Sequence, residues 1–171
     1  MVVKIFFTDG SCSGNPGPGG FGVVQIVSVW RETLDDYIES KSIAYHYSEQ
    51  CENTTNNREE MKAILHVFKI AANDPDNQYI IYSDSAYCVN MINDWIWNWS
   101  KNNWKNSKKK EVENLDLVLE LYKYINKEFF NCQVVKVKGH NNIVENELAD
   151  ALATNNITKF EKICKTNIIL F

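Results

Sequence analysis

The segment TDGSCSGNPGPGG, residues 8–20, determines how the first part of the chain folds. It follows a short apolar and β-branched run at 2–8, and it holds five of the seven glycines and two of the three prolines. An apolar run that leads into residues of this kind predicts a strand followed by a turn. The next apolar run, 21–29, is therefore expected to return antiparallel to the first.

A weaker apolar run at 41–47 predicts a third strand, so that the first three strands form an antiparallel meander. The acidic segment 31–40 is expected to be a surface hairpin loop. From residue 57, apolar residues recur at three- and four-residue spacing, which predicts a helix that ends before Asp74-Pro75. The remaining predicted elements are a strand at 79–83, helices at about 85–95 and 114–128, a strand at 132–138 and a helix at 145–153.

This order of elements predicts an α/β fold with a five-stranded mixed sheet, in which three antiparallel strands are followed by two parallel ones and helices flank the sheet. The 171 residues are expected to form one domain, 1–171, with its core at about 1–154. The tail, 155–171, has no clear pattern.

Composition excludes several classes of protein. Hydrophobic residues at 44% and charged residues at 23% are typical of a globular chain and exclude a disordered or fibrous one. There is no apolar run of roughly 18 residues and no signal-peptide pattern, so we expect a soluble, intracellular protein in the cytoplasm without a membrane partner. The five cysteines form no C-x2-C pair, which argues against a disulfide framework and a structural zinc site.

The net charge of −4 counts against a nucleic-acid partner unless the basic residues are clustered. The stretch 94–110 provides such a cluster, because it holds four of the five tryptophans and five lysines. Trp95 and Trp99 share a helical spacing, so they either pack a helix onto the core or contact a ligand. Trp104 beside Lys105 is typical of a surface that stacks against bases and neutralises phosphates.

Two carboxylates come at the ends of predicted strands. Asp9 closes the first strand and Asp84 closes the strand at 79–83. The ends of adjacent strands meet at one edge of such a sheet, and two carboxylates placed there repel each other unless a divalent cation joins them. Glu60 and Asp150 lie on predicted helices, where an acidic residue taken alone is usually solvated.

Four blocks in order closely resemble the type 1 ribonuclease H family, over Met1 to about Ala153. They are residues 8–20, then 54–61 (TTNNREEM), then 82–85 (YSDS), and finally Lys138-Gly139-His140 together with 145–150 (ENELAD). The resemblance implies a ribonuclease H-like fold. It also implies an endonuclease that hydrolyses the RNA strand of RNA–DNA hybrids and leaves 5′-phosphate and 3′-hydroxyl ends.

The resemblance assigns the catalytic roles residue by residue. Asp9, Glu60, Asp84 and Asp150 resemble the family's four catalytic carboxylates, which hold two Mg²⁺ ions, with Mn²⁺ as an alternative. Carboxylate oxygens suit such hard cations, and two of them can activate water and neutralise a phosphodiester. His140 resembles the family's mobile catalytic histidine, which moves protons or helps to release product.

The resemblance also implies the contacts with the hybrid. Cys12, Asn15, Asn56 and Asn57 would contact the hybrid, and Thr55 would hold a DNA phosphate. The stretch 94–110 resembles the basic protrusion of many bacterial members, which grips the DNA strand. Its implied contact residues are Trp95, Trp99, Trp104, Lys105, Lys108, Lys109 and Lys110. The protein is expected to act as a monomer.

The chain departs from the family pattern at three places: Ala86 stands where glutamine is common, 141–144 lacks the usual glycine and proline, and the segment between strands two and three is longer. Two alternatives stay open. One is another nuclease of the same fold, such as a Holliday-junction resolvase or an integrase. The other is a catalytically idle hybrid-binding module. The intact acidic residues argue against the idle module, and the Asn56-Asn57-Arg58 block with the basic stretch argues against the other nucleases.

Overall fold

A computed structural model describes residues 1–32, 37–128, 130–139 and 143–167 of the chain. Five strands form one sheet in the order β3-β2-β1-β4-β5, in which β2 pairs antiparallel with β1 and β3, and β4 pairs parallel with β1 and β5. The strands are β1 (Val3–Cys12), β2 (Gly17–Glu32), β3 (Tyr37–Thr54), β4 (Gln78–Ser83) and β5 (Cys132–Lys136). The predicted mixed sheet is confirmed.

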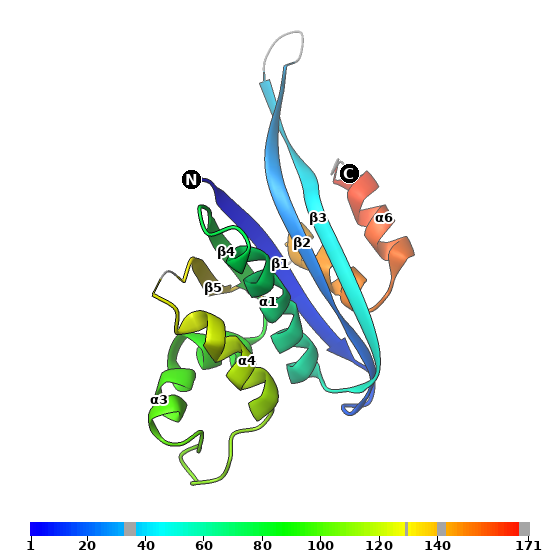
Figure 1. The fold of residues 1–171 in the computed structure, drawn as a ribbon. Coiled ribbons are helices and arrows are strands. Elements are labelled where there is room, and N and C mark those ends of the chain that lie inside the picture. Colours follow the sequence, from blue (N-terminus) through cyan, green and yellow to red (C-terminus); the bar gives the residue numbers. More distant parts are fainter. Residues whose placement is uncertain (33–36, 129, 140–142, 168–171) are drawn as a thin grey trace.

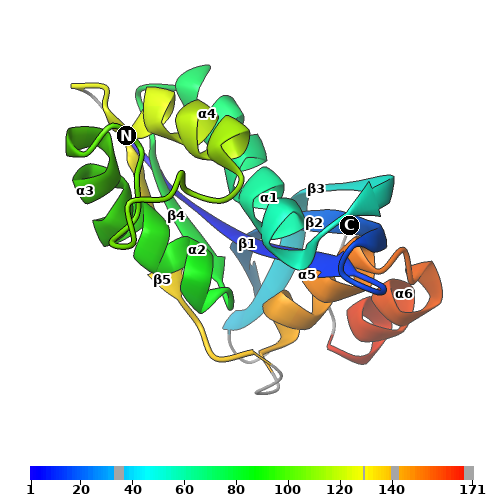
Figure 2. The ribbon, with the colours of Figure 1, turned by 90° about the horizontal axis from the view of Figure 1, so that it is seen from below.

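Helices cover both faces of this sheet (Figures 1 and 2). Helices α1 and α4 lie on one face, whereas α5 and α6 lie on the other. The helices are α1 (Asn56–Ala72), α2 (Ala86–Asn90), a π-helical turn η1 (Met91–Trp95), α3 (Ile96–Lys101), α4 (Leu115–Ile125), α5 (Val144–Ala153) and α6 (Ile157–Thr166). Among the described residues, no helix is long and apolar enough to cross a membrane.

Strand β1 lies at the centre of the sheet and is buried on both faces. Phe6 belongs to the core cluster under α1, and its neighbour Phe7 belongs to the cluster under α5 and α6. Successive side chains of a strand point to opposite faces, so one strand supplies both cores. This explains why two aromatic residues, Phe6 and Phe7, follow each other in the strand instead of alternating with polar ones.

The structure corrects the predicted surface loop at 31–40. Strand β2 continues to Glu32 and β3 begins at Tyr37, with the ladder running out to the pair Glu32↔Tyr37. The two strands therefore extend beyond the rest of the sheet (Figure 1). Paired backbone groups satisfy each other whatever the side chains are, so polar residues do not end an antiparallel ladder.

Other boundaries also differ from the sequence-based prediction, and the third strand, predicted at 41–47, continues to Thr54. The glycine-rich turn is shorter than 9–20, because β1 continues to Cys12 and β2 starts at Gly17. The helix predicted at 85–95 continues through η1 and α3 to Lys101. The unassigned tail contains α6, whose Phe160 and Cys164 are buried in the core cluster with α5. The three- and four-residue spacing of Ile157, Phe160 and Cys164 was the signal for this helix that the sequence-based prediction missed.

Candidate active site

Three carboxylates from separate elements meet at one edge of the sheet. Asp9 lies in β1, Asp84 directly follows β4, and Glu60 lies in the first turns of α1. One oxygen from each of them lies within 4.8 Å of the others. Strands β1 and β4 pair in parallel up to Thr8↔Ser83, which brings the predicted strand-end carboxylates side by side.

Two glycines let helices approach Asp9 from both faces. A Cβ atom on Gly10 would lie 2.2 Å from the backbone nitrogen of Glu60, and one on Gly22 would lie 2.2 Å from the carbonyl oxygen of Ala149. Gly22 is the cross-strand partner of Asp9. Any larger side chain at these positions would push α1 or α5 away from the sheet. The close approach of both helices therefore depends on glycine.

Asp150, on α5, reaches the same place from the opposite face. It is close enough to act on Asp9, since its charge is one of the causes that raise the pKa of that carboxyl. Its Oδ2 also accepts a hydrogen bond from Nζ of Lys159 on α6, at 2.5 Å. Asp150 is thus beside the group of three carboxylates but is already paired with a cation.

Burial and mutual repulsion make these acids reluctant to ionise. Desolvation by burial, together with the charges of Asp84 and Asp150, raises the pKa of Asp9 to about 8. Burial, and then the charges of Asp9 and Asp84, raise the pKa of Glu60 well above its usual value. Two buried carboxyls that resist ionisation point to a site that lacks positive charge.

The donor set fits a hard divalent cation. Oε2 of Glu60 is buried and has no hydrogen-bond partner among the described residues. All the converging ligand atoms are carboxylate oxygens, which Mg²⁺ and Mn²⁺ prefer. A cation bound here would satisfy the orphaned oxygen and remove the repulsion between the acids. The residues therefore match the metal that the sequence analysis expects, although they do not identify the ion.

Two buried residues beside the carboxylates were missed by the sequence analysis. Asn146, 3% exposed, donates from Nδ2 to Oδ2 of Asp84 at 3.2 Å. Glu59, 1% exposed, accepts from Oγ1 of Thr54 at 2.6 Å and from Nζ of Lys62 at 2.7 Å. The four-residue spacing between Asn146 and Asp150 was the available signal, because it places both on one helix face.

His140, the predicted catalytic histidine, lies outside the described residues. Gly139, which precedes it, lies against the site, since a Cβ atom there would be 2.6 Å from Oδ2 of Asp84. The segment that leads to His140 therefore starts at the carboxylates.

The predicted hybrid-binding residues of the first two blocks gather beside this edge. Oδ1 of Asn15, in the glycine-rich turn, accepts from the backbone nitrogen of Asn56 at 3.0 Å. The Cys12 thiol donates to the carbonyl of Thr54 at 3.2 Å. Thr55 is the N-cap of α1, and Asn57 is half-buried in the first turn. The fold thus joins two blocks that are some 40 residues apart.

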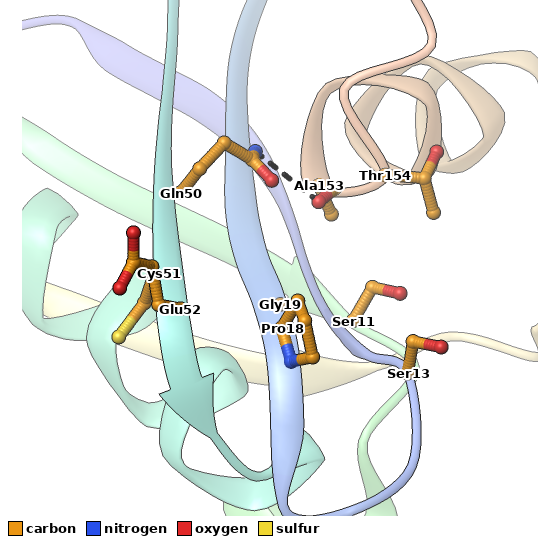
Figure 3. A pocket seen from close by; sticks show the side chains of 9 residues that line it. All are labelled: Ser11, Ser13, Pro18, Gly19, Gln50, Cys51, Glu52, Ala153 and Thr154. Atoms are coloured by element: carbon orange, nitrogen blue, oxygen red, sulfur yellow. Dashed lines mark hydrogen bonds between the residues drawn. The ribbon is translucent and has the colours of Figure 1, made fainter.

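A groove of about 460 Å³ lies between the end of β1, the start of β2, β3 and the end of α5 (Figure 3). Ser11 and Thr154 line it, two residues after Asp9 and four residues after Asp150. Gln50 lines the opposite side and donates from Nε2 to the carbonyl oxygens of Leu152 and Ala153, both at 3.3 Å. The groove presents hydroxyl groups beside the acids, and the sequence analysis did not predict it.

The basic stretch 94–110 comprises the end of η1, helix α3 and the loop that follows α3. Its Trp95 and Trp99 are half-buried: they pack against the core and also line a groove of about 670 Å³ with Lys105 and Lys109. Both interpretations of these two tryptophans are therefore compatible with the fold. The ring of Trp104 contacts the ring of Tyr122, with centroids 5.0 Å apart. Trp104 therefore packs against the core, in addition to the surface role that its position beside Lys105 predicts. The four lysines that the sequence analysis selected are all exposed: Lys105, Lys108, Lys109 and Lys110.

Comparison with known proteins gives consistent matches. The family described as RNase H matches residues 2–158. A ribonuclease H of Caldicellulosiruptor saccharolyticus is 41% identical, with 92% of this chain and 97% of the relative covered. A ribonuclease HI of Pasteurella multocida is 42% identical, with 86% and 84% covered.

Solved structures support the same fold. LC9-RNase H1, described as a type 1 RNase H with the type 2 active-site motif, has a TM-score of 0.67 and 25% identity, over 94% of this chain and 72% of that one. A foamy viral protease-reverse transcriptase in complex with RNA/DNA hybrid has a TM-score of 0.70 and 22% identity, over 89% of this chain and 19% of that one. The carboxylate edge, the mixed sheet and these relatives agree, and the chain belongs to the ribonuclease H family of endoribonucleases.

Proposed function

We propose that this protein hydrolyses the RNA strand of RNA–DNA hybrids with two divalent cations, Mg²⁺ or Mn²⁺, held by Asp9, Glu60, Asp84 and Asp150. The observation that carries the proposal is the convergence of three carboxylates within 4.8 Å, with Asp150 on α5 near enough for its charge to raise the pKa of Asp9. When bound, the ions supply Lewis-acid activation of water and neutralise charge on the phosphate.

The hydrolysis balances without a covalent intermediate. A water oxygen forms a bond to phosphorus, and the bond between phosphorus and the upstream O3′ breaks. The water gives up a proton, and the departing O3′ takes one. The fragments therefore carry a 5′-phosphate and a 3′-hydroxyl. His140 is our candidate for moving one of these protons, because imidazole titrates near neutral pH.

Recognition of the hybrid is assigned to two surfaces. Asn15, Asn56, Asn57 and Cys12 lie together at the carboxylate edge, where amide groups can meet RNA 2′-hydroxyls in the minor groove. The exposed lysines of the loop after α3 would neutralise phosphates of the DNA strand.

The test is cleavage of labelled RNA–DNA hybrid, duplex RNA, duplex DNA and a four-way junction, each with Mg²⁺ and with EDTA. We expect cleavage of the RNA strand of the hybrid alone, and only with the cation. Ligation of the purified fragments, with and without prior phosphatase, reads the ends. Cleavage of the junction would favour the resolvase alternative, and binding of hybrid without cleavage would favour the idle module.

A further inference from the structure

Lys159 links α6 to the carboxylate edge. Its Nζ lies 2.5 Å from Oδ2 of Asp150 and 2.8 Å from Oε2 of Glu147, two acids on α5. The lysine comes from a different helix and from the tail of the chain, nine residues after Asp150. Lys159 therefore makes a tertiary contact with Asp150, the carboxylate that lies outside the group of three.

The backbone around Lys159 is fixed by contacts on both sides of this residue. Oδ1 of Asn156, the N-cap of α6, accepts from the backbone nitrogen of Lys159 at 2.9 Å. The next residue, Phe160, is 4% exposed and packs in the core cluster with α5. These contacts fix the backbone of Lys159 on α6, and its side chain, which is 34% exposed, reaches from there to the two acids on α5.

Charge determines what the contact does. Asp150 has the carboxyl of Asp9 on one side and the ammonium of Lys159 on the other. The ammonium offsets the repulsion between the two acids. A divalent cation that approaches Asp150 meets a positive charge already bonded to Oδ2, so it must displace the lysine or share the carboxylate with it.

We propose that Lys159 is an internal counter-ion of Asp150 that holds this carboxylate in the metal-free enzyme and competes with divalent cations for it. Lys159 is then a positioning residue, since it acts through Asp150. The proposal rests on the proposed function, because it takes Asp150 as a metal ligand. It goes further by assigning α6 a part in setting how tightly the site binds its cation.

The test is titration of the metal-free protein with Mn²⁺, with free Mn²⁺ followed by electron paramagnetic resonance. Lys159→Met removes the charge and keeps an apolar stem, whereas Lys159→Arg keeps the charge. Lys41→Met is the matched control, because Lys41 pairs with Glu145 on the same helix without touching Asp150. The double variant Lys159→Met/Asp150→Asn shows whether the effect passes through Asp150.

We expect Lys159→Met to bind Mn²⁺ about three- to fivefold more tightly than wild type, the size of a partly exposed ion pair. Lys159→Arg and Lys41→Met should stay within about twofold of wild type, and Lys159→Met should have no effect in the Asp150→Asn background. In EDTA, Lys159→Met should also melt about 1–3 °C lower. Unchanged or weaker Mn²⁺ binding in Lys159→Met would overturn the proposal. Normal hybrid cleavage by Asp150→Asn would instead refute the role of Asp150 in the proposed function.

Discussion

The carboxylate edge and the basic loop after α3 are two charged regions of the described structure, and they are built in opposite ways. The acids come from β1, α1, the end of β4 and α5, and Asp9 and Glu60 are each only 8% exposed. The lysines come from one continuous stretch and are exposed. The net charge of −4 reveals neither region, because the acidic and basic residues largely cancel in the sum.

The two regions differ in how much free energy it costs to place their charges. Bringing like charges together in a partly buried site raises the pKa of Asp9 and Glu60 and destabilises the metal-free fold. Exposed lysines keep their hydration, so their placement costs little and their effect reaches outward to phosphates. We therefore expect changes at the edge to alter both chemistry and stability, and changes in the loop to alter binding alone.

The largest expected effect is that of Asp9→Asn. Hybrid cleavage should fall by at least about 1,000-fold, because a central oxygen ligand loses its charge with almost no change of shape. The metal-free protein should melt about 2–4 °C higher, since repulsion at the edge is relieved. Single-turnover cleavage and thermal melting in EDTA measure the two effects. Asp76→Asn, at an exposed position away from the edge, is the control and should change neither cleavage nor melting temperature. Near-normal cleavage by Asp9→Asn would show that the carboxylate edge is not the site of the chemistry.

The second prediction concerns the basic loop. Replacing Lys105, Lys108, Lys109 and Lys110 together with alanine should weaken hybrid binding about 10- to 100-fold at low salt. The slope of log K against log salt should flatten by about 0.7–0.9 for each phosphate that a lysine no longer neutralises. Single-turnover cleavage at saturating hybrid should change little.

Fluorescence anisotropy over a salt series measures this binding. The control replaces four exposed lysines outside the loop: Lys123, Lys127, Lys162 and Lys165. If both quadruple variants lose the same affinity, the loop acts only through overall charge and has no special role.

The third prediction is a pH dependence of stability. In EDTA, the folded state holds a proton on Asp9 up to a pKa of about 8, whereas the unfolded state loses it near pH 4. Stability should therefore fall as the pH rises from about 4 to 8, by at most about 1.4 kcal/mol per pH unit for one such group. Asp9→Asn should show a shallower fall, and Mg²⁺ should counteract it by binding the ionised form. Urea unfolding from pH 5 to 8 measures this free energy. If it falls with pH at the same rate in wild type and Asp9→Asn, burial of the Asp9 carboxyl does not destabilise the metal-free fold.

The smallest expected effect is at a contact between the two regions. Arg58, near the start of α1, donates to both carboxylate oxygens of Asp116 on α4, at 2.9 and 2.7 Å. The pair joins the acidic edge to the point where the chain returns from the basic loop. Asp116 is largely exposed, so Arg58→Ala should lower the melting temperature by only about 1–3 °C. Arg58→Lys should restore part of it, and additive effects in Arg58→Ala/Asp116→Ala would show that the pair is not coupled.

Much of the fold follows from local pattern. Periodicity separated the helix after residue 57 from the strands before it, and the parallel pairing of β1 with β4 followed from the order of elements. The four blocks pointed to Asp9, Glu60 and Asp84, which the fold brings together. The hairpin loop predicted at 31–40 was given bounds that are too wide, because ladder hydrogen bonds between backbones continue to Glu32 and Tyr37 in spite of an acidic composition; residues 33–36 lie outside the described part of the chain.

What the sequence determined by itself is therefore the period of each element, the presence of a turn within residues 8–20 and the identity of the acids, since these depend on neighbouring residues. Only the tertiary structure decided that Asn146 supports Asp84, that α6 packs on α5 and that Lys159 pairs with Asp150. These contacts join residues from separate elements, and the energy that favours them comes from burial and charge in the assembled core. No local pattern records which distant partner a side chain will meet once the helices have docked on the sheet.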